Sequence, residues 1–165
     1  SLPMTDPLAP RTLALAAAAA SGLLLLAALG FQAAGYRPCE LCLLQRWPHL
    51  AALLVGAVVL LAGYRPLWAG LGMVAAAVAT GLALYHTGVE LHWWAGPSAC
   101  AGGVADLSTI SAADLLSRIR GAQVVRCDEP AWVFLGLSMA AWNALISAGL
   151  TVLWGASLAR GLSRR

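Results

Sequence analysis

Two cysteines separated by two residues lie in the segment PCELCLLQR, residues 38–46. The spacing of Cys39 and Cys42 is common in redox dithiols and in metal sites. A disulfide between them would stabilise the fold little, because a crosslink gains stability mainly from the length of chain that it closes. The pair therefore indicates thiol chemistry or metal binding rather than a structural crosslink.

Two further cysteines, Cys100 and Cys127, complete a set of four. Four cysteines allow three pairings. If Cys39 and Cys42 pair locally, Cys100 and Cys127 form the second pair, and a crosslink over such a loop contributes about 3–4 kcal/mol in the chain-entropy model. For this second pair alone, a stabilising disulfide is the simplest interpretation.

The surroundings of Cys42 favour a reactive thiol. Pro38 suits the first position of a helix, so Cys42 is expected near a helix N-terminus, where the helix dipole favours a thiolate. Arg46 follows four residues later on the same face, and a nearby positive charge also lowers the pKa of a thiol. The alternative for Arg46 is an interfacial side chain whose stem lies along apolar surface.

Zinc and haem are the alternatives to thiol redox chemistry. An all-cysteine zinc site usually has two Cys-x-x-Cys pairs, and the second pair is missing here. A c-type haem needs a histidine directly after the second cysteine, where Leu43 stands. His49 and His86 leave a b-type haem open, although no other feature of the sequence indicates a haem pocket.

Titratable residues also lie inside or at the ends of apolar segments. His49 lies one turn inside such a segment, and His86 and Glu90 are four residues apart at the end of another. Because ionisable side chains are costly in a membrane, residues at these depths are functional candidates. For any single one, an interfacial or packing role is at least as good an interpretation.

The elements that must position these residues are apolar helices. Of the 165 residues, 61% are hydrophobic and 10% are charged, and the mean hydropathy is +0.79. A soluble domain is usually about a quarter charged, whereas a membrane-spanning helix needs about 20 mostly apolar residues. The sequence predicts an all-α integral membrane protein, a single domain (1–165) with a four-transmembrane-helix bundle. The four predicted spans cover residues 12–31, 43–62, 67–86 and 131–154.

Two details refine the predicted elements. The second span is expected to begin early, at Pro38, so that Pro48 falls inside the helix and kinks it. The long loop carries the segment STISAADLLSRIR, residues 108–120, which is predicted to form a short amphipathic helix. Ser111 and Asp114 fit a helix start signal. Such a helix lies on the membrane surface or packs on the end of the bundle.

The arginines set the predicted orientation. Four spans place both termini on one side, with extracytoplasmic loops over about residues 32–42 and 87–130. The termini side carries Arg11, Arg65, Arg160, Arg164 and Arg165, and the opposite side carries Arg37, Arg46, Arg118, Arg120 and Arg126. Because Arg118 and Arg120 lie deep in a long loop, where the positive-inside rule weakens, the termini are predicted to be cytoplasmic. All four cysteines then face the periplasm of a bacterial inner membrane, where disulfides persist.

Charge also bears on the partners. The sequence has no lysine, and its largest basic cluster is the C-terminal RGLSRR. No nucleic-acid partner is therefore expected, and the expected surroundings are membrane lipid.

The combined pattern resembles the DsbB family of membrane disulfide-forming proteins over about residues 36–142. The matching elements are Cys39-x-x-Cys42 followed by Arg46, His86-Thr87 with Glu90, the separation of Cys100 from Cys127, and WVFLGLSMAAW at residues 132–142. The resemblance implies an enzyme that passes electrons from a soluble DsbA-like thioredoxin-fold oxidase to a membrane quinone, either ubiquinone or menaquinone.

The resemblance also implies a role for each cysteine. Cys100 would take the attack of the partner's thiolate, and Cys127 would exchange with Cys39. Cys42 would face the quinone, where Arg46 would stabilise the thiolate and the charge of the reduced quinone. The residues expected to line the quinone pocket with Cys42 and Arg46 are His86 and Glu90.

Two other classes of protein remain as alternatives. A vitamin-K-epoxide-reductase-like oxidoreductase also has a four-helix core with paired cysteines, but it places its Cys-x-x-Cys late in the chain. The other alternative is a non-enzymatic four-span protein that binds haem or a metal and has structural disulfides.

Overall fold

The structure is a computed structural model that describes residues 6–97, 111–113, 116 and 125–164. Within this part of the chain, four helical segments are long and apolar enough to cross a membrane, which confirms the predicted fold class. The helices are α1 (Pro10–Ala33), α2 (Glu40–Leu44), α3 (Arg46–Ala62), α4 (Pro66–Glu90) and α6 (Met139–Ser163). A short hairpin of β1 (Val133–Phe134) and β2 (Leu137–Ser138) precedes α6.

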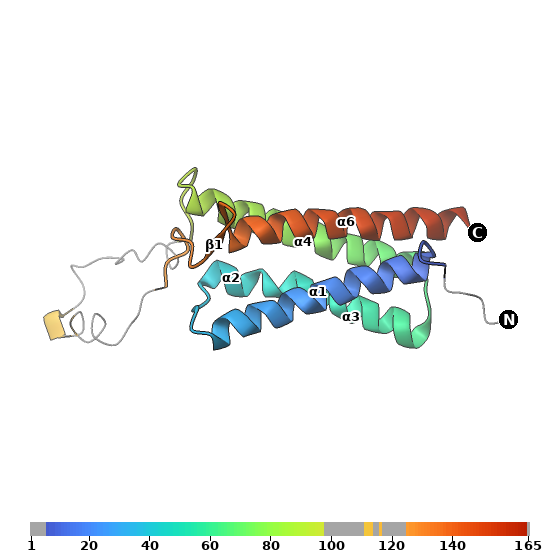
Figure 1. Ribbon diagram of the computed structural model, residues 1–165, viewed down its shortest axis with the longest axis horizontal. Helices are drawn as coiled ribbons and strands as arrows, with labels where there is room; N and C mark the ends of the chain where they lie inside the picture. Colours follow the sequence, from blue (N-terminus) through green and yellow to red (C-terminus); the bar gives the residue numbers. More distant parts are fainter. Residues whose placement is uncertain (1–5, 98–110, 114–115, 117–124, 165) are drawn as a thin grey trace.

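The helices form a bundle in which α1 and α4 lie on opposite corners. The α1 helix packs against α3 and α6, and α4 packs against the same two helices. The ends of α1 and α6 near the two termini lie together at one end of the bundle, and α2 and the hairpin lie at the other (Figure 1). The cysteines at the start of α2 are therefore at the end opposite the termini.

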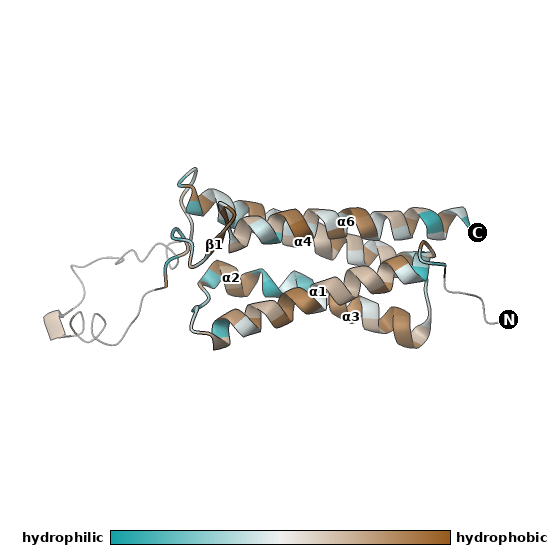
Figure 2. Ribbon diagram, in the orientation of Figure 1, coloured by the Kyte–Doolittle hydropathy of each residue, from teal (hydrophilic) through white to brown (hydrophobic). Residues whose placement is uncertain are grey.

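Small residues form the interior of the bundle, and large apolar residues face outward. Alanines from α1, α3 and α4 line the core around the fully buried Trp154 of α6. Large side chains such as Leu61, which is 85% exposed, point away from it. The helices are accordingly largely brown in Figure 2, with teal where α2 passes into α3. This distribution suits a membrane, where small residues let helix backbones pack closely and exposed leucine side chains contact the equally apolar lipid tails.

Gly56 is a point of close approach between α3 and α1. A β-carbon built at Gly56 would overlap the side chain of Ala18, whereas one built at Gly81 on α4 meets nothing within 4 Å. We expect Gly56→Ala to lower the free energy of unfolding by about 1–3 kcal/mol, the usual cost of overpacking. Gly81→Ala is the matched control and should be neutral or slightly stabilising, because alanine favours helix. Thermal unfolding in detergent measures both, and equal melting temperatures would contradict the close packing.

The second span is interrupted at Gln45, between α2 and α3. Pro48 has no N–H to donate to the carbonyl of Leu44, so the helical ladder is broken there. The expected irregularity at Pro48 thus takes the form of a break. The expected start at Pro38 is wrong: the helix begins at Glu40, and Cys39 occupies the N-cap position.

The fourth helix begins at Met139 rather than at Ala131. The residues between them form the β1–β2 hairpin, whose two turn residues, Leu135 and Gly136, have φ values of 52° and 78°. Positive φ at both positions is the geometry of a two-residue hairpin turn. Ser138 then caps α6 by accepting the N–H of Ala141. The apolar run that begins at Ala131 predicts a helix, but hydropathy does not report backbone conformation.

The predicted amphipathic helix lies mostly outside the described residues. Ala112, Ala113 and Leu116 are helical. Ser111 is described and directly precedes the helical Ala112. The remaining predicted positions, including Asp114, Leu115 and Ile119, and the cysteine Cys100 are outside the described part of the chain.

Candidate active site

The two cysteines of the Cys-x-x-Cys pair meet at the first turn of α2. Cys39 is the N-cap residue, and its Sγ accepts the backbone N–H of Cys42 at 3.3 Å. The two Sγ atoms are 3.1 Å apart, within hydrogen-bond distance of each other. Both cysteines are free thiols, whereas Cys127 is disulfide-bonded.

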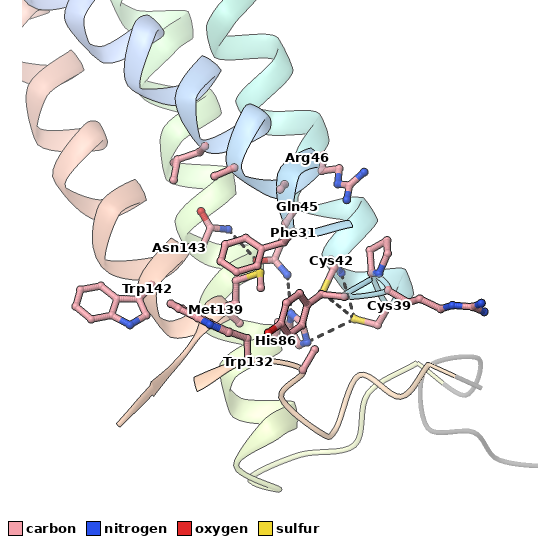
Figure 3. A pocket seen from close by; sticks show the side chains of 18 of the residues that line it. Phe31, Cys39, Cys42, Gln45, Arg46, His86, Trp132, Met139, Trp142 and Asn143 are labelled. Carbon is pink, nitrogen blue, oxygen red and sulfur yellow. Dashed lines mark hydrogen bonds between the residues drawn. The ribbon is translucent and has the colours of Figure 1, made fainter. Parts of the chain in front are cut away.

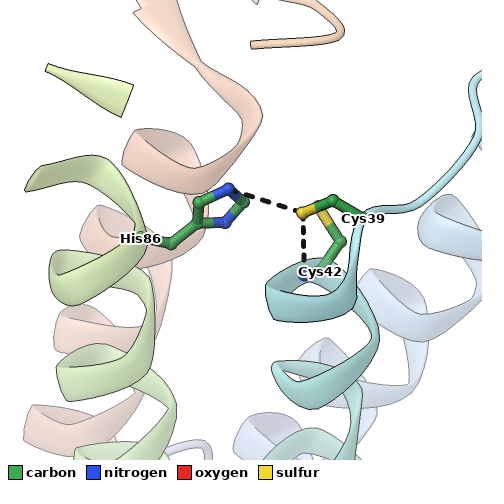
Figure 4. A group of neighbouring side chains, drawn as sticks. All are labelled: Cys39, Cys42 and His86. Carbon is green, nitrogen blue, oxygen red and sulfur yellow. Dashed lines mark hydrogen bonds between the residues drawn. The ribbon is translucent and has the colours of Figure 1, made fainter. Parts of the chain in front are cut away.

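His86, near the C-terminal end of α4, points toward Cys39 across the gap between α4 and α2 (Figure 4). Its Nε2 lies 3.7 Å from the Cys39 Sγ and 3.2 Å from the backbone oxygen of Cys127. The same nitrogen lies 3.4 Å from a carboxylate oxygen of Glu90, one turn further along α4. One imidazole therefore contacts residues from both cysteine pairs.

These contacts make Cys39 the better thiolate. The hydrogen bond from the Cys42 thiol is the largest cause that lowers the pKa of Cys39 well below its ordinary range. Burial raises the pKa of Cys39, and the hydrogen bond from His86 lowers it. The sequence indicated Cys42 as the activated thiol, but the hydrogen-bond donors in the structure surround Cys39. Cys39 is the N-cap residue of α2, so its sulfur accepts the N–H of Cys42.

Cys39 and Cys127 also share a buried cluster. They are 4% and 0% exposed, and Leu41 and Val89 complete the cluster. Contact with both α2 and α4 thus holds the Cys127 end of the long loop beside the Cys-x-x-Cys pair. The predicted partner of Cys127, Cys100, lies outside the described residues.

A cavity of about 320 Å³ opens beside the two free cysteines (Figure 3). It brings together all the described residues that the sequence proposed for a cofactor pocket. These residues are Cys42, Arg46, His86 and Glu90. Its apolar wall comes mainly from α1 and α6, and includes Leu24, Leu25, Ala28, Phe31, Met139 and Ile146.

Two pocket residues were not singled out from the sequence. Gln45 is 7% exposed and lies at the break between α2 and α3. Asn143 projects from α6 and hydrogen-bonds to Gln45 through its Nδ2 at 2.8 Å. Each is an uncharged polar residue in an apolar stretch of the sequence. Because amides inside membrane helices hydrogen-bond to neighbouring helices, this position in the sequence is the signal that could have identified them.

The sulfurs of Cys39 and Cys42 and a ring nitrogen of His86 lie within 4.8 Å of one another, as the ligand atoms of a metal site do. Both nitrogens of His86, however, already contact protein groups. Both nitrogens of His49 also have partners, in Ser21 and Asn143. A metal or haem iron would have to displace one of these hydrogen bonds, so the geometry favours thiol chemistry over the metal and haem alternatives.

A four-span membrane bundle with a partly buried dithiol beside a disulfide-bonded cysteine defines a class, the membrane-embedded thiol oxidoreductases. The chain matches the family described as "Disulfide bond formation protein DsbB" over residues 10–157. It belongs to the DsbB family, and is a multi-pass membrane oxidoreductase of disulfide bond formation.

Individual relatives agree with this assignment. The chain is 33% identical over 139 residues to "Disulfide bond formation protein B" of Cupriavidus necator, covering 79% of this chain and 78% of that protein. It is 32% identical over 136 residues to the protein of that name from Cupriavidus pinatubonensis, with the same coverage. The relative from Xanthomonas oryzae pv. oryzae is 31% identical over 128 residues, covering 74% of each chain. No solved structure matches the chain.

Proposed function

We propose that this protein oxidises a DsbA-like thioredoxin-fold dithiol in the periplasm and transfers the electrons to a membrane quinone. The observation that carries the proposal is the cavity beside α2. It joins the free cysteines Cys39 and Cys42 to a guanidinium, an imidazole and an otherwise mainly apolar wall.

The donor set of the cavity fits a quinone. A quinone head group is flat and apolar and has two carbonyl oxygens that accept hydrogen bonds. Leu24 on α1 and Ile146 on α6 supply apolar surface, and the half-buried Arg46 supplies a donor with a permanent positive charge. Because α1 and α6 carry outward leucines, a lipid-soluble molecule reaches this cavity from the bilayer. When bound, the quinone supplies the acceptor for two electrons and two protons.

The protein residues perform the sulfur chemistry. Cys42 is partly exposed and lines the cavity, so we assign it to the acceptor side. Cys39 is buried against Cys127, so we assign it to exchange with the loop. Formation of the Cys39–Cys42 disulfide from two thiols releases two electrons and two protons, which balances the reduction of one quinone to one quinol. His86 holds the hydrogen that faces Cys39 during this step, and Arg46 favours negative charge in the cavity.

The loop disulfide is the oxidant for the partner. We propose that Cys127 pairs with Cys100, since Cys127 is disulfide-bonded while Cys39 and Cys42 are free. The partner's thiolate attacks Cys100 and forms a mixed disulfide, and the second thiol of the partner then releases it. The reduced loop is reoxidised by exchange between Cys127 and the Cys39–Cys42 disulfide. In the orientation predicted from the arginines, both termini are cytoplasmic and the cysteines are periplasmic.

Trapping tests the partner directly. In Cys127→Ser the Cys100 thiol can attack the disulfide of the oxidised partner, and the mixed disulfide that forms lacks Cys127, the loop thiol that would displace the partner. We expect a disulfide-linked adduct with a purified DsbA-like oxidase, visible on a non-reducing gel and lost on reduction. The control is the Cys100→Ser/Cys127→Ser double variant, which should form no adduct. An adduct of equal yield in the control, or none in Cys127→Ser, would contradict the assignment of Cys100.

A further inference from the structure

A chain of buried and partly buried polar side chains connects the active site to the middle of the bundle. It runs from His86 on α4 through Gln45 and Asn143 to His49 on α3, and Figure 3 shows its outer part. The links are 2.7 Å from Gln45 to His86, 2.8 Å from Asn143 to Gln45 and 2.8 Å from His49 to Asn143. A buried network of this kind costs stability unless every member has a partner, so its position beside the dithiol calls for a reason.

The direction of each hydrogen bond in the outer part of this chain is fixed by backbone oxygens, which can only accept hydrogen bonds. The Nε2 of Gln45 lies 3.0 Å from the backbone oxygen of Leu41, which only accepts. This atom is therefore the amide NH₂, and its second hydrogen points to the Nδ1 of His86, which must accept. At the other side of the ring, Nε2 lies 3.2 Å from the backbone oxygen of Cys127, also an obligate acceptor. Both ends thus place the ring hydrogen of His86 on Nε2.

We propose that Gln45, held by Asn143, is a positioning residue that keeps the ring hydrogen of His86 on Nε2, facing the Cys39 sulfur. In the opposite tautomer, a lone pair of His86 would face the sulfur and repel a thiolate. The network thereby selects the form of the imidazole that stabilises negative charge on Cys39, without contacting Cys39 itself.

Asn143 orients Gln45 rather than His86. Its Nδ2 donates to the Gln45 oxygen, and its own oxygen accepts from Ser147 at 2.9 Å and from His49. These contacts oppose a rotation of the Gln45 amide that would exchange its oxygen and nitrogen. Asn143 is therefore the second positioning residue, with a smaller expected effect, because the backbone oxygen of Leu41 also holds Gln45.

The test compares Gln45→Met with Gln32→Met. Methionine has nearly the same shape as glutamine but no donor, and Gln32 is an exposed residue on α1 that serves as the matched control. The full chain is studied in detergent with Cys100→Ser and Cys127→Ser, so that Cys39 and Cys42 are the remaining thiols. Asn143→Leu is measured as well, in case Gln45→Met does not fold.

Two readouts follow the proposal. Nitrogen-15 NMR of labelled histidines should show His86 with its hydrogen on Nε2 in the parent protein and in Gln32→Met, and a mixture of tautomers in Gln45→Met. The midpoint of the Cys39 thiolate absorbance, recorded against pH, should move upward in Gln45→Met, with the acid dissociation constant falling roughly threefold to tenfold, as expected for weakening a hydrogen bond to a charged group. Asn143→Leu should show a smaller fall.

Charge changes do not complicate the comparison. Besides the two cysteines and the two histidines His49 and His86, the charged groups that line the cavity are Glu90, Glu129, Arg37, Arg46 and Arg126. Each substitution replaces one neutral side chain by another, so these charges stay as they are. An unchanged His86 tautomer in both Gln45→Met and Asn143→Leu would overturn the proposal, and so would an unchanged thiolate titration.

The inference deepens the proposed function, but its test does not depend on that function. Neither readout needs a quinone or a partner oxidase. Failure to trap a partner would contradict the proposed function but not the tautomer assignment. An unchanged tautomer would contradict the role of Gln45 but not the proposed quinone-linked turnover. The two failures are therefore distinguishable.

Discussion

Cys42→Ser is expected to abolish sustained oxidation of a DsbA-like partner with quinone as the acceptor. The Cys39–Cys42 disulfide cannot form without the second sulfur, so electrons that reach Cys39 have no exit. We expect turnover to fall to the uncatalysed background, a loss of at least about a thousandfold, as is usual when a residue that forms the covalent link is removed. Quinone absorbance followed in the presence of excess reduced partner measures this rate.

A single-turnover experiment sharpens the result. The loop disulfide at Cys127 is separate from the Cys39–Cys42 pair, so Cys42→Ser should still oxidise up to one equivalent of partner and then stop. The control is Thr80→Val on α4, which removes a buried hydroxyl that bonds to the Ala76 carbonyl but leaves the site intact. Sustained turnover by Cys42→Ser would refute the proposed electron path.

The second large effect is expected for His86→Ala, and it depends on pH. The imidazole donates toward Cys39, and a hydrogen bond to a charged group is worth about 1.5–3 kcal/mol, or roughly tenfold to a hundredfold in thiolate population. Loss of this donor moves the pKa of Cys39 upward, toward the ordinary thiol value of about 8.5. At a pH near the lowered pKa of Cys39, turnover should therefore fall by up to roughly tenfold to a hundredfold.

The sign of the pH effect follows from the lowered pKa of Cys39. In the parent protein the thiolate persists below the ordinary thiol pKa and is lost only as the pH falls through the lowered value. In His86→Ala the thiolate is lost at a higher pH than in the parent protein, so the deficit is largest in acid and shrinks as the pH rises above the shifted pKa. The matched control is His92→Ala, which removes an exposed histidine. A deficit that is equal at all pH values would contradict a role in thiolate stabilisation.

Much of the site was predictable because its parts are local in sequence. The Cys-x-x-Cys spacing identifies Cys39 and Cys42 as a dithiol, and a four-residue separation places His86 and Glu90 on one face of a helix. The proposed quinone pocket contains all of its described members, because each lies at the same end of a span. The prediction failed where backbone detail decides: the helix begins at Glu40 rather than at Pro38, and this two-residue shift makes Cys39 the N-cap residue that accepts the N–H of Cys42.

The sequence by itself determined the membrane fold, since four apolar stretches of sufficient length admit few arrangements other than a helical bundle. It also identified the four cysteines on which the proposed sulfur chemistry rests. Only the tertiary structure decided what surrounds them. The contact of His86 with Cys39, and its link to Gln45 and through Asn143 to His49, joins residues 41 to 98 positions apart. Such contacts depend on how three helices pack against one another, and no local periodicity or motif specifies them.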